Sequence, residues 1–290
     1  MKAGFIGLGA MGYAMAANLH RAGLLACVYN RSAGSRDHFA AEFGVTAVSD
    51  PAELAAACDA IVLCVSADAD VLQMITAIAP RLHPDTLVID CSTVASDTDC
   101  QAAEMVIAAG GSFLDAPVSG GTEGAANATL SIMAGGDAAS FERAQPLFQA
   151  MGKNIVHMGP IGAGQATKAV NQVMGAGVHQ AVAEAMAFAE ALALPLDKVV
   201  DVVGAGASGN WFVNHRGKSM VRGEYAGFGF KLSLHHKDML ICRRMAQANG
   251  GHLPLAEQTI ADQERLMADG YGDEDVSALY RLKRGLFQGG

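Results

Sequence analysis

The sequence predicts an α/β fold: a domain built on a parallel β-sheet, followed by an all-α domain. In the first half of the chain, short apolar runs typical of strands alternate with amphipathic runs typical of helices. Strands that are apolar nearly throughout are typical of a parallel sheet with helices on both faces. In the second half the strand-like runs do not return, and Gly and Pro separate helix-like segments. We therefore expect two domains, covering residues 1–162 and 163–290.

The expected strands of the first domain cover residues 2–7, 26–29, 60–65, 86–90, 112–115 and 130–134. Helices are expected between them, at residues 11–22, 70–78, 96–108 and 139–151. The second domain should begin with a long, mostly apolar helix at 165–192, followed by helices at 196–203, 210–221, 232–249, 255–268 and 276–285. A helix that is apolar nearly all round should be buried. In so small a domain part of this helix should pack against another subunit, so we expect a homodimer or homotetramer.

Composition excludes several classes of protein. The 20 basic and 29 acidic residues give a net charge of −9, which would repel a nucleic-acid backbone. No apolar run reaches the ~18 residues that a membrane span needs, and the first residues lack the layout of a secretory signal. The six cysteines are scattered, without zinc spacing, and no H-x-x-H pattern occurs. We expect a cytoplasmic protein with reduced thiols and no metal, which binds neither nucleic acid nor membrane.

A glycine pattern follows the first expected strand: Gly7-Leu8-Gly9-Ala10-Met11-Gly12. The pattern alone is a weak signal, because the chain has 34 glycines. Its place between a strand and a helix strengthens it. The first glycine permits a tight turn, the second lets the backbone approach a pyrophosphate, and the third lets helix and strand pack closely. The segment therefore predicts a Rossmann-type dinucleotide-binding domain.

The end of the second strand bears on the choice of cofactor. A carboxylate there would bind the ribose hydroxyls of NAD, but the chain has Asn30-Arg31-Ser32. Arg31 can pair with a 2′-phosphate, so we expect NADP, with NAD as the alternative. Val65-Ser66 also ends a strand and should flank the cofactor, although by pattern alone it could be an ordinary helix cap.

Two further segments suggest a catalytic site. Ser119-Gly120-Gly121 follows a strand and could hold a small carboxylate, or could be a simple glycine-rich turn. Lys168 and Asn171 lie three residues apart near the start of the long helix and share one face. A lysine on an apolar helix is expensive to bury unless it is paired or used, but it could equally extend its charge to solvent.

Four co-linear motifs give the chain a specific resemblance. They are Phe5–Gly12, Asp115–Gly121, Gly162–Gln172 and Lys237-Asp238, and they cover essentially the whole length. The chain resembles the β-hydroxyacid dehydrogenase family, which includes 3-hydroxyisobutyrate dehydrogenase, tartronate semialdehyde reductase and glyoxylate/succinic semialdehyde reductase.

The resemblance implies the roles of individual residues. It implies that Lys168 is the catalytic lysine and that Asn171 orients the substrate. Gln172 stands where some members have a second asparagine and tartronate semialdehyde reductases have glutamine, so it is expected to bind substrate. The family's carboxylate-binding segment falls on Ser119, Gly120 and Gly121, its cofactor contacts on Thr93 and Lys237, and its variable substrate region on the segment that contains Trp211.

We therefore expect an NADP(H)-dependent oxidoreductase that moves a hydride between the cofactor and a small hydroxyacid or semialdehyde carboxylate. Lys168 would act as general acid in reduction and general base in oxidation. Two alternatives remain: an NADPH-dependent imine reductase, and a catalytically silent NADP-binding interaction module. Lys168 with Asn171 argues against the imine reductase, and Lys168 argues against the silent module, which should lack the lysine.

Overall fold

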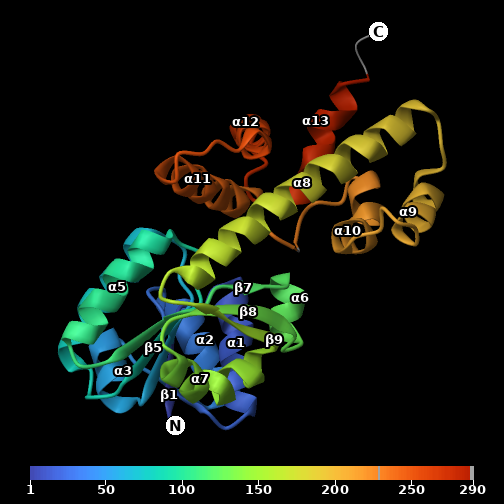
Figure 1. Ribbon diagram of the computed structural model, residues 1–290. Helices are drawn as coiled ribbons and strands as arrows, with labels where there is room; N and C mark the ends of the chain where they lie inside the picture. The colour runs from blue at the N-terminus through green and yellow to red at the C-terminus, as the bar shows by residue number, and fades with distance from the viewer. Residues whose placement is uncertain (228, 288–290) are drawn as a thin grey trace. The chain divides into compact units, whose positions relative to one another are not determined.

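The computed structural model describes residues 1–227 and 229–287 (Figure 1). The chain divides into two compact units, Met1–Lys168 and Ala169–Gly290. Each unit contains its own clusters of buried apolar side chains. This agrees with the predicted fold class, a sheet domain followed by helices.

One sheet organises the first unit, and its centre is parallel. Its order is β3 (Thr46–Ala47), β2 (Leu25–Tyr29), β1 (Ala3–Ile6), β4 (Ala60–Leu63), β5 (Leu87–Asp90), β6 (Ser112–Asp115), β8 (Leu130–Gly135) and β7 (Val118–Ser119). The first six strands in this order, from β3 at the edge to β6, pair in parallel with their neighbours, as predicted. Beyond β6 the sheet is mixed, because β8 runs antiparallel to β6 and β7. A further strand, β9 (Gly152–Gly159), pairs in parallel with β8.

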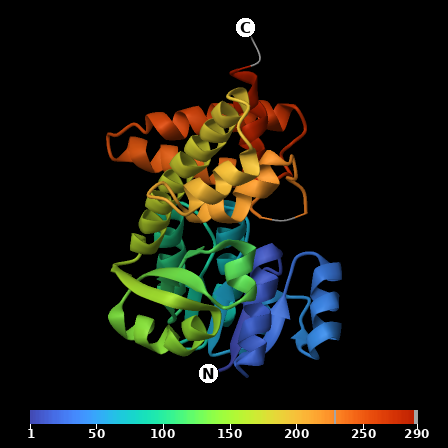
Figure 2. The same cartoon turned by 90° about the vertical axis from the view of Figure 1, so that its right-hand side faces the viewer.

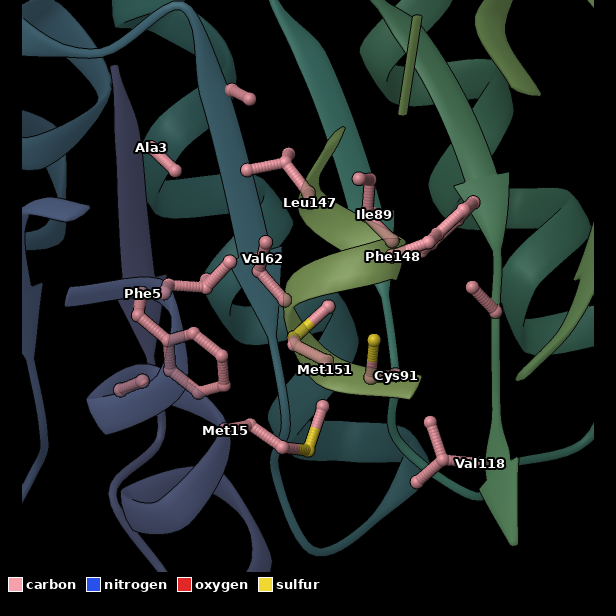
Figure 3. Packing of buried hydrophobic residues seen from close by; sticks show 14 of the residues in the cluster. Ala3, Phe5, Met15, Val62, Ile89, Cys91, Val118, Leu147, Phe148 and Met151 are labelled. Atoms are coloured by element: carbon pink, nitrogen blue, oxygen red, sulfur yellow. The ribbon is translucent and has the colours of Figure 1, made fainter. Parts of the chain in front are cut away.

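Helices cover both faces of this sheet. On one face, β-strand residues Phe5, Val62 and Ile89 pack with Met15 and Phe148 (Figure 3). This face is covered by α1 (Ala10–Arg21), α2 (Ala33–Phe43), α6 (Gly121–Ala126) and α7 (Ala138–Met151). The alternate strand residues form a second core with α3 (Pro51–Ala57), α4 (Asp68–Ile78) and α5 (Ser96–Ala108). A short 3-10 helix, η1 (Ala79–Arg81), follows α4. Burial on both faces explains why the central strands lack a polar alternation.

The second unit is helical within the residues described. Its elements are the greater part of α8 (Ala163–Ala191), then α9 (Leu196–Gly204), α10 (Trp211–Val221), α11 (Leu232–Ala248), α12 (Pro254–Ala268), η2 (Val276–Ala278) and α13 (Leu279–Gly285). Helices α11 and α12 lie side by side (Figures 1 and 2). One core gathers Val182 and Met186 of α8 with Phe212 and Tyr280, and a smaller one joins α8 to α11 and α12.

Within the described residues, no helix combines the length and the apolar character that crossing a bilayer requires. None of the six cysteines, all of which lie within the described residues, forms a disulfide. Two of them, Cys27 and Cys58, contact each other in the buried core with their sulfur atoms 3.5 Å apart.

Candidate active site

The glycine loop between β1 and α1 has the geometry that its sequence predicted. Gly7 has φ +100°, and a Cβ there would lie 2.2 Å from the Cys64 carbonyl oxygen. At Gly12 a Cβ would lie 1.9 Å from the Gly7 carbonyl oxygen. The chain's own packing therefore requires glycine at both positions.

Gly9 differs, because a Cβ there would meet no described atom within 4 Å. The protein's own packing leaves this position open, at the N-terminus of α1. A pyrophosphate could approach the backbone here, where the first N–H groups of a helix face outward. The predicted cofactor segment Leu8–Gly12, with Ala10 and Met11 in the first turn of α1, therefore fits a dinucleotide.

A cavity of about 230 Å³ opens beside this loop. Eight of the predicted cofactor residues line it: Gly7, Leu8, Gly9, Asn30, Arg31, Ser32, Val65 and Ser66. Asn30 holds the loop in place, because its Oδ1 accepts a 2.8 Å hydrogen bond from the Leu8 N–H. The structure thus brings the ends of β1, β2 and β4 together around one space.

Arg31 has a partner that the sequence did not indicate. Its Nη1 donates a 2.9 Å hydrogen bond to Oδ1 of Asp70 on α4, and Asp70 also lines the cavity. The Arg31 side chain is 77% exposed. The Asp70 side chain is 22% exposed. An ion pair whose cation lies largely in solvent contributes little stability, so another anion can replace Asp70.

Thr93 lies in the loop after β5, and its neighbour Ser92 ties that loop to the next strand end. The Ser92 hydroxyl oxygen accepts a 2.9 Å hydrogen bond from the Val65 N–H. The loop after β5 is therefore fixed against the segment that contains Val65 and Ser66.

The predicted carboxylate-binding turn needs glycine for its conformation. Gly120 has φ +138° and Gly121 has φ +65°, both in the region that favours glycine. The ammonium group of Lys168 donates a 2.9 Å hydrogen bond to the carbonyl oxygen of Val118, which directly precedes Ser119. Lys168 is only 7% exposed, and its predicted role beside this turn stays a prediction.

Three buried carboxyl groups were absent from the predicted site: Asp90, Asp99 and Asp115. Asp99 and Asp115 bond to residues at the start of α8. Asp115 accepts hydrogen bonds from the Gly162 N–H at 2.8 Å and the Gln165 N–H at 2.9 Å. Burial raises the pKa of the Asp115 carboxyl to about 6, although these N–H donors oppose the shift. Asp115 therefore caps the helix that carries Lys168.

Gln165 extends this anchor to the loop after β5. Its Nε2 donates to the Ser92 carbonyl oxygen at 2.9 Å and to Oδ2 of Asp99 at 2.8 Å. Burial, followed by the neighbouring Asp90 carboxyl, raises the pKa of Asp99 well above its usual range. The start of α8 and the loop that contains Thr93 thus form one hydrogen-bonded assembly.

In the second unit, three predicted site residues are joined through Asp238. Asn171 Nδ2 donates to Gln172 Oε1 at 2.8 Å, and Gln172 Nε2 donates to Asp238 Oδ2 at 2.7 Å. Lys237 Nζ lies 3.1 Å from Asp238 Oδ1. Asp238 belongs to the Lys237-Asp238 motif, for which only Lys237 had a predicted role.

Trp211 packs against other residues of its own helix. Its ring stacks on His215 at 4.4 Å, and the guanidinium of Arg216 lies 5.1 Å from its centroid, all on α10. The indole is 49% exposed, and its predicted contact with substrate stays a prediction. Among the described residues, His, Cys, Asp and Glu form no group of three that could hold a metal ion.

Comparison with known proteins covers both halves of the chain. Residues 2–159 match the model of the NAD binding domain of 6-phosphogluconate dehydrogenase. Residues 162–283 match a family model described as NAD-binding of NADP-dependent 3-hydroxyisobutyrate dehydrogenase. The first half, with the cavity described above, and the second half therefore both resemble parts of nicotinamide-dependent enzymes.

Individual relatives match along nearly their whole length. The NAD-dependent L-serine dehydrogenase of Pseudomonas aeruginosa is 34% identical, with 96% of each chain covered. The 2-(hydroxymethyl)glutarate dehydrogenase of Eubacterium barkeri is 31% identical, over 97% of this chain and 94% of that one. A solved structure of Mycobacterium tuberculosis 3-hydroxyisobutyrate dehydrogenase with L-serine has a TM-score of 0.86 at 32% identity, covering 98% of this chain and 99% of that one.

Fold, cavity and comparisons define a pyridine-nucleotide-dependent oxidoreductase. The chain belongs to the β-hydroxyacid dehydrogenase family.

Proposed function

We propose that this enzyme transfers a hydride between NADP(H) and a small 3-hydroxyacid or semialdehyde carboxylate, with Lys168 as general acid and base. One observation carries the proposal. The nearly buried Lys168 ammonium reaches the carbonyl of Val118, at the edge of the Ser119–Gly121 turn. A cation so close to a glycine-rich turn suits a substrate that carries both a carboxylate and a reacting oxygen.

Each site residue would have its own role in the proposed hydride transfer. Backbone N–H groups and the hydroxyl of Ser119 would hold the substrate carboxylate. As an ammonium, Lys168 would stabilise the negative charge that develops on the carbonyl oxygen and donate a proton to it. In the reverse direction the neutral amine would take the hydroxyl proton. Asn171 would hold the substrate oxygen in place, and the bound nicotinamide would supply or accept the hydride.

The preference for NADP rests on Arg31 and on the lack of a carboxylate at the end of β2. Arg31 and Ser32 line the cavity next to the start of α2. Asp70 opposes this preference, because it holds Arg31 and adds negative charge beside the expected 2′-phosphate. We infer that a 2′-phosphate displaces Asp70 from Arg31, since the pair is exposed and weak.

The names of three relatives support a proposal for the substrate class. Serine, 3-hydroxyisobutyrate and 2-(hydroxymethyl)glutarate, named for three of them, share a hydroxymethyl group on the carbon next to a carboxylate. We propose that the substrate here has the same core, a 2-substituted 3-hydroxypropionate or the matching semialdehyde.

A substrate panel tests the proposal. Serine, 3-hydroxyisobutyrate, 2-(hydroxymethyl)glutarate, glycerate and 4-hydroxybutyrate would be oxidised with NADP and NAD, and the matching semialdehydes and glyoxylate would be reduced with NADPH and NADH. We expect turnover of at least one substrate with the shared core, faster with NADP(H), and loss of it in Lys168→Ala. Reduction of cyclic imines with no activity on any carboxylate would overturn the proposal.

We also propose that α8 forms a subunit interface. Val170, Met174, Phe188 and Leu192 are 53–69% exposed, although all are large and apolar. Residues 18 apart on a helix lie five turns apart on one face, so Val170 aligns with Phe188, while Leu192 directly follows the end of α8. We expect light scattering to give a multiple of 29.9 kDa, and Met174→Glu with Phe188→Glu to give the monomer. A wild-type monomer at micromolar concentration would contradict this.

A further inference from the structure

Four polar side chains of the second unit form one hydrogen-bonded series. Asn171 donates to Gln172, Gln172 donates to Asp238, and Asp238 pairs with Lys237, over 2.8, 2.7 and 3.1 Å. Gln172 and Asp238 are 6% and 3% exposed. The series links the residue predicted to orient the substrate with a residue predicted to contact the cofactor.

The carboxylate gives this series a direction. An ionised carboxylate accepts hydrogen bonds and donates none, whereas an amide has a donating and an accepting end of similar size. Asp238 Oδ2 therefore requires the NH₂ end of Gln172. The Gln172 oxygen must then face Asn171, so Asn171 must turn its own NH₂ group toward Gln172.

We propose that Gln172 and Asp238 are positioning residues that fix the direction of the Asn171 amide. The inference rests on the proposed role of Asn171 in holding the substrate oxygen. One N–H of Asn171 is committed to Gln172, so its other N–H and its Oδ1 keep constant directions. Gln172, predicted to bind substrate, is instead assigned to this series, because both ends of its amide are engaged.

The ion pair with Lys237 adds a second function to Asp238. The same carboxylate that orders the two amides holds the ammonium group of Lys237 through its other oxygen. A change at Asp238 should therefore affect both the handling of substrate and the affinity for the cofactor, through two separable routes.

Asp238→Asn tests the direction of the series, since an amide there can both donate and accept. We expect kcat to fall about 10- to 100-fold, as for other residues that orient a site. In an Asn171→Ala background the same change should alter kcat less than about threefold, because its target is gone. The loss of cofactor affinity, which acts through Lys237, should persist in both backgrounds.

The chain offers a matched control: Gln180 lies on α8, as Gln172 does, and it too bonds to a buried aspartate, Asp262 on α12. Gln180 Nε2 donates to Asp262 Oδ2 at 3.0 Å, and Lys283 Nζ also lies 3.0 Å from that oxygen. Asp262→Asn removes an equally buried charge from a glutamine and lysine. It should lower the melting temperature without a kcat effect that depends on Asn171.

A readout without substrate complements the kinetics. The side-chain amide signals of Asn171 and Gln172, assigned by NMR, should move in Asp238→Asn and stay in Asp262→Asn. An equal kcat loss from Asp238→Asn in both backgrounds, or no loss in the wild type, would overturn the inference. If Lys168→Ala abolishes turnover while Asn171→Ala does not, the inference about Gln172 and Asp238 is wrong but the proposed function stands. If Lys168→Ala is fully active, the proposed function fails.

Discussion

The ammonium group of Lys168 lies 2.9 Å from the carbonyl oxygen of Val118, fifty residues earlier in the chain. The contact holds a nearly buried cation at the edge of a turn whose glycines adopt positive φ. Asp115, three residues before Val118, caps the helix that carries the lysine. Strand β6 and its following turn thus fix both the base of the helix and the tip of its lysine.

Replacement of Lys168 by alanine should lower kcat by about two to four orders of magnitude, because a general acid and base is lost. The dissociation constant of NADPH, measured by fluorescence titration, should change little. The exposed Lys153 on β9, replaced by alanine, is the control and should retain wild-type turnover. Near-normal kcat in the Lys168 variant would remove the residue from the chemistry.

Substitutions of Arg31 and of Asp70 should change the affinity for NADPH in opposite directions. Arg31→Ala should weaken NADPH roughly 10- to 100-fold through loss of a charge-assisted contact and leave NADH nearly unchanged. Asp70→Asn should strengthen NADPH about two- to fivefold, because an exposed competing ion pair is removed. Titration of both cofactors measures this, with the exposed Arg81 replaced by alanine as control. Equal losses of NADPH and NADH in Arg31→Ala would refute a 2′-phosphate contact.

Two glycines of one loop should respond differently to the same substitution. Gly12→Ala forces a Cβ against the Gly7 carbonyl and should destabilise the protein by about 1–3 kcal/mol or more. Gly9→Ala meets open space, so its melting temperature should stay near that of the wild type. Its affinity for dinucleotide should nevertheless fall, because the methyl group occupies the approach to the backbone. Unchanged affinity in Gly9→Ala would place the cofactor elsewhere.

His179 should make the fold less stable in acid. Burial lowers its pKa well below the ordinary value, so between that pKa and about 6.5 the unfolded chain binds a proton that the folded chain does not. Stability contributed by the neutral ring is therefore present above about pH 6.5 and is lost as the pH falls, by at most about 1.4 kcal/mol per pH unit.

Melting curves from pH 8 to 5 would show this as a smaller acid loss in His179→Leu than in the wild type. The exposed His38, replaced by glutamine, serves as control. Asp115 contributes with the opposite sign, since its pKa is raised to about 6 and its protonation favours the fold. It is common to both proteins, so it cancels in their difference. Parallel curves would contradict the assignment to His179.

Local sequence patterns were enough to predict those elements whose structure depends on residues close together in the sequence. The β1–α1 loop follows from glycine spacing, and the central strands follow from apolar runs buried on both faces. Helix α2 escaped prediction because Phe39 is its one fully buried residue, which leaves no apolar stripe to detect. Strand β9 was missed because most of its side chains are exposed at the edge of the sheet.

The missing parts of the candidate site depend on contacts distant in sequence. Asp70 meets Arg31 across 39 residues, and Gln165 meets Asp99 across 66. No spacing rule connects such pairs. Their residue types are ordinary at helix starts and strand ends, so burial and partners become visible only in three dimensions.

The cap that Asp115 places on α8 bears on how the nucleotide-binding half can be prepared by itself. The family match to this half ends at residue 159, before the N–H donors of Gly162 and Gln165. In a fragment truncated there, the buried Asp115 carboxyl would lose its N–H donors. Ser92 and Asp99 would lose their hydrogen bonds from the Gln165 amide. A recombinant fragment meant for crystallisation or binding studies should therefore retain the chain through Lys168.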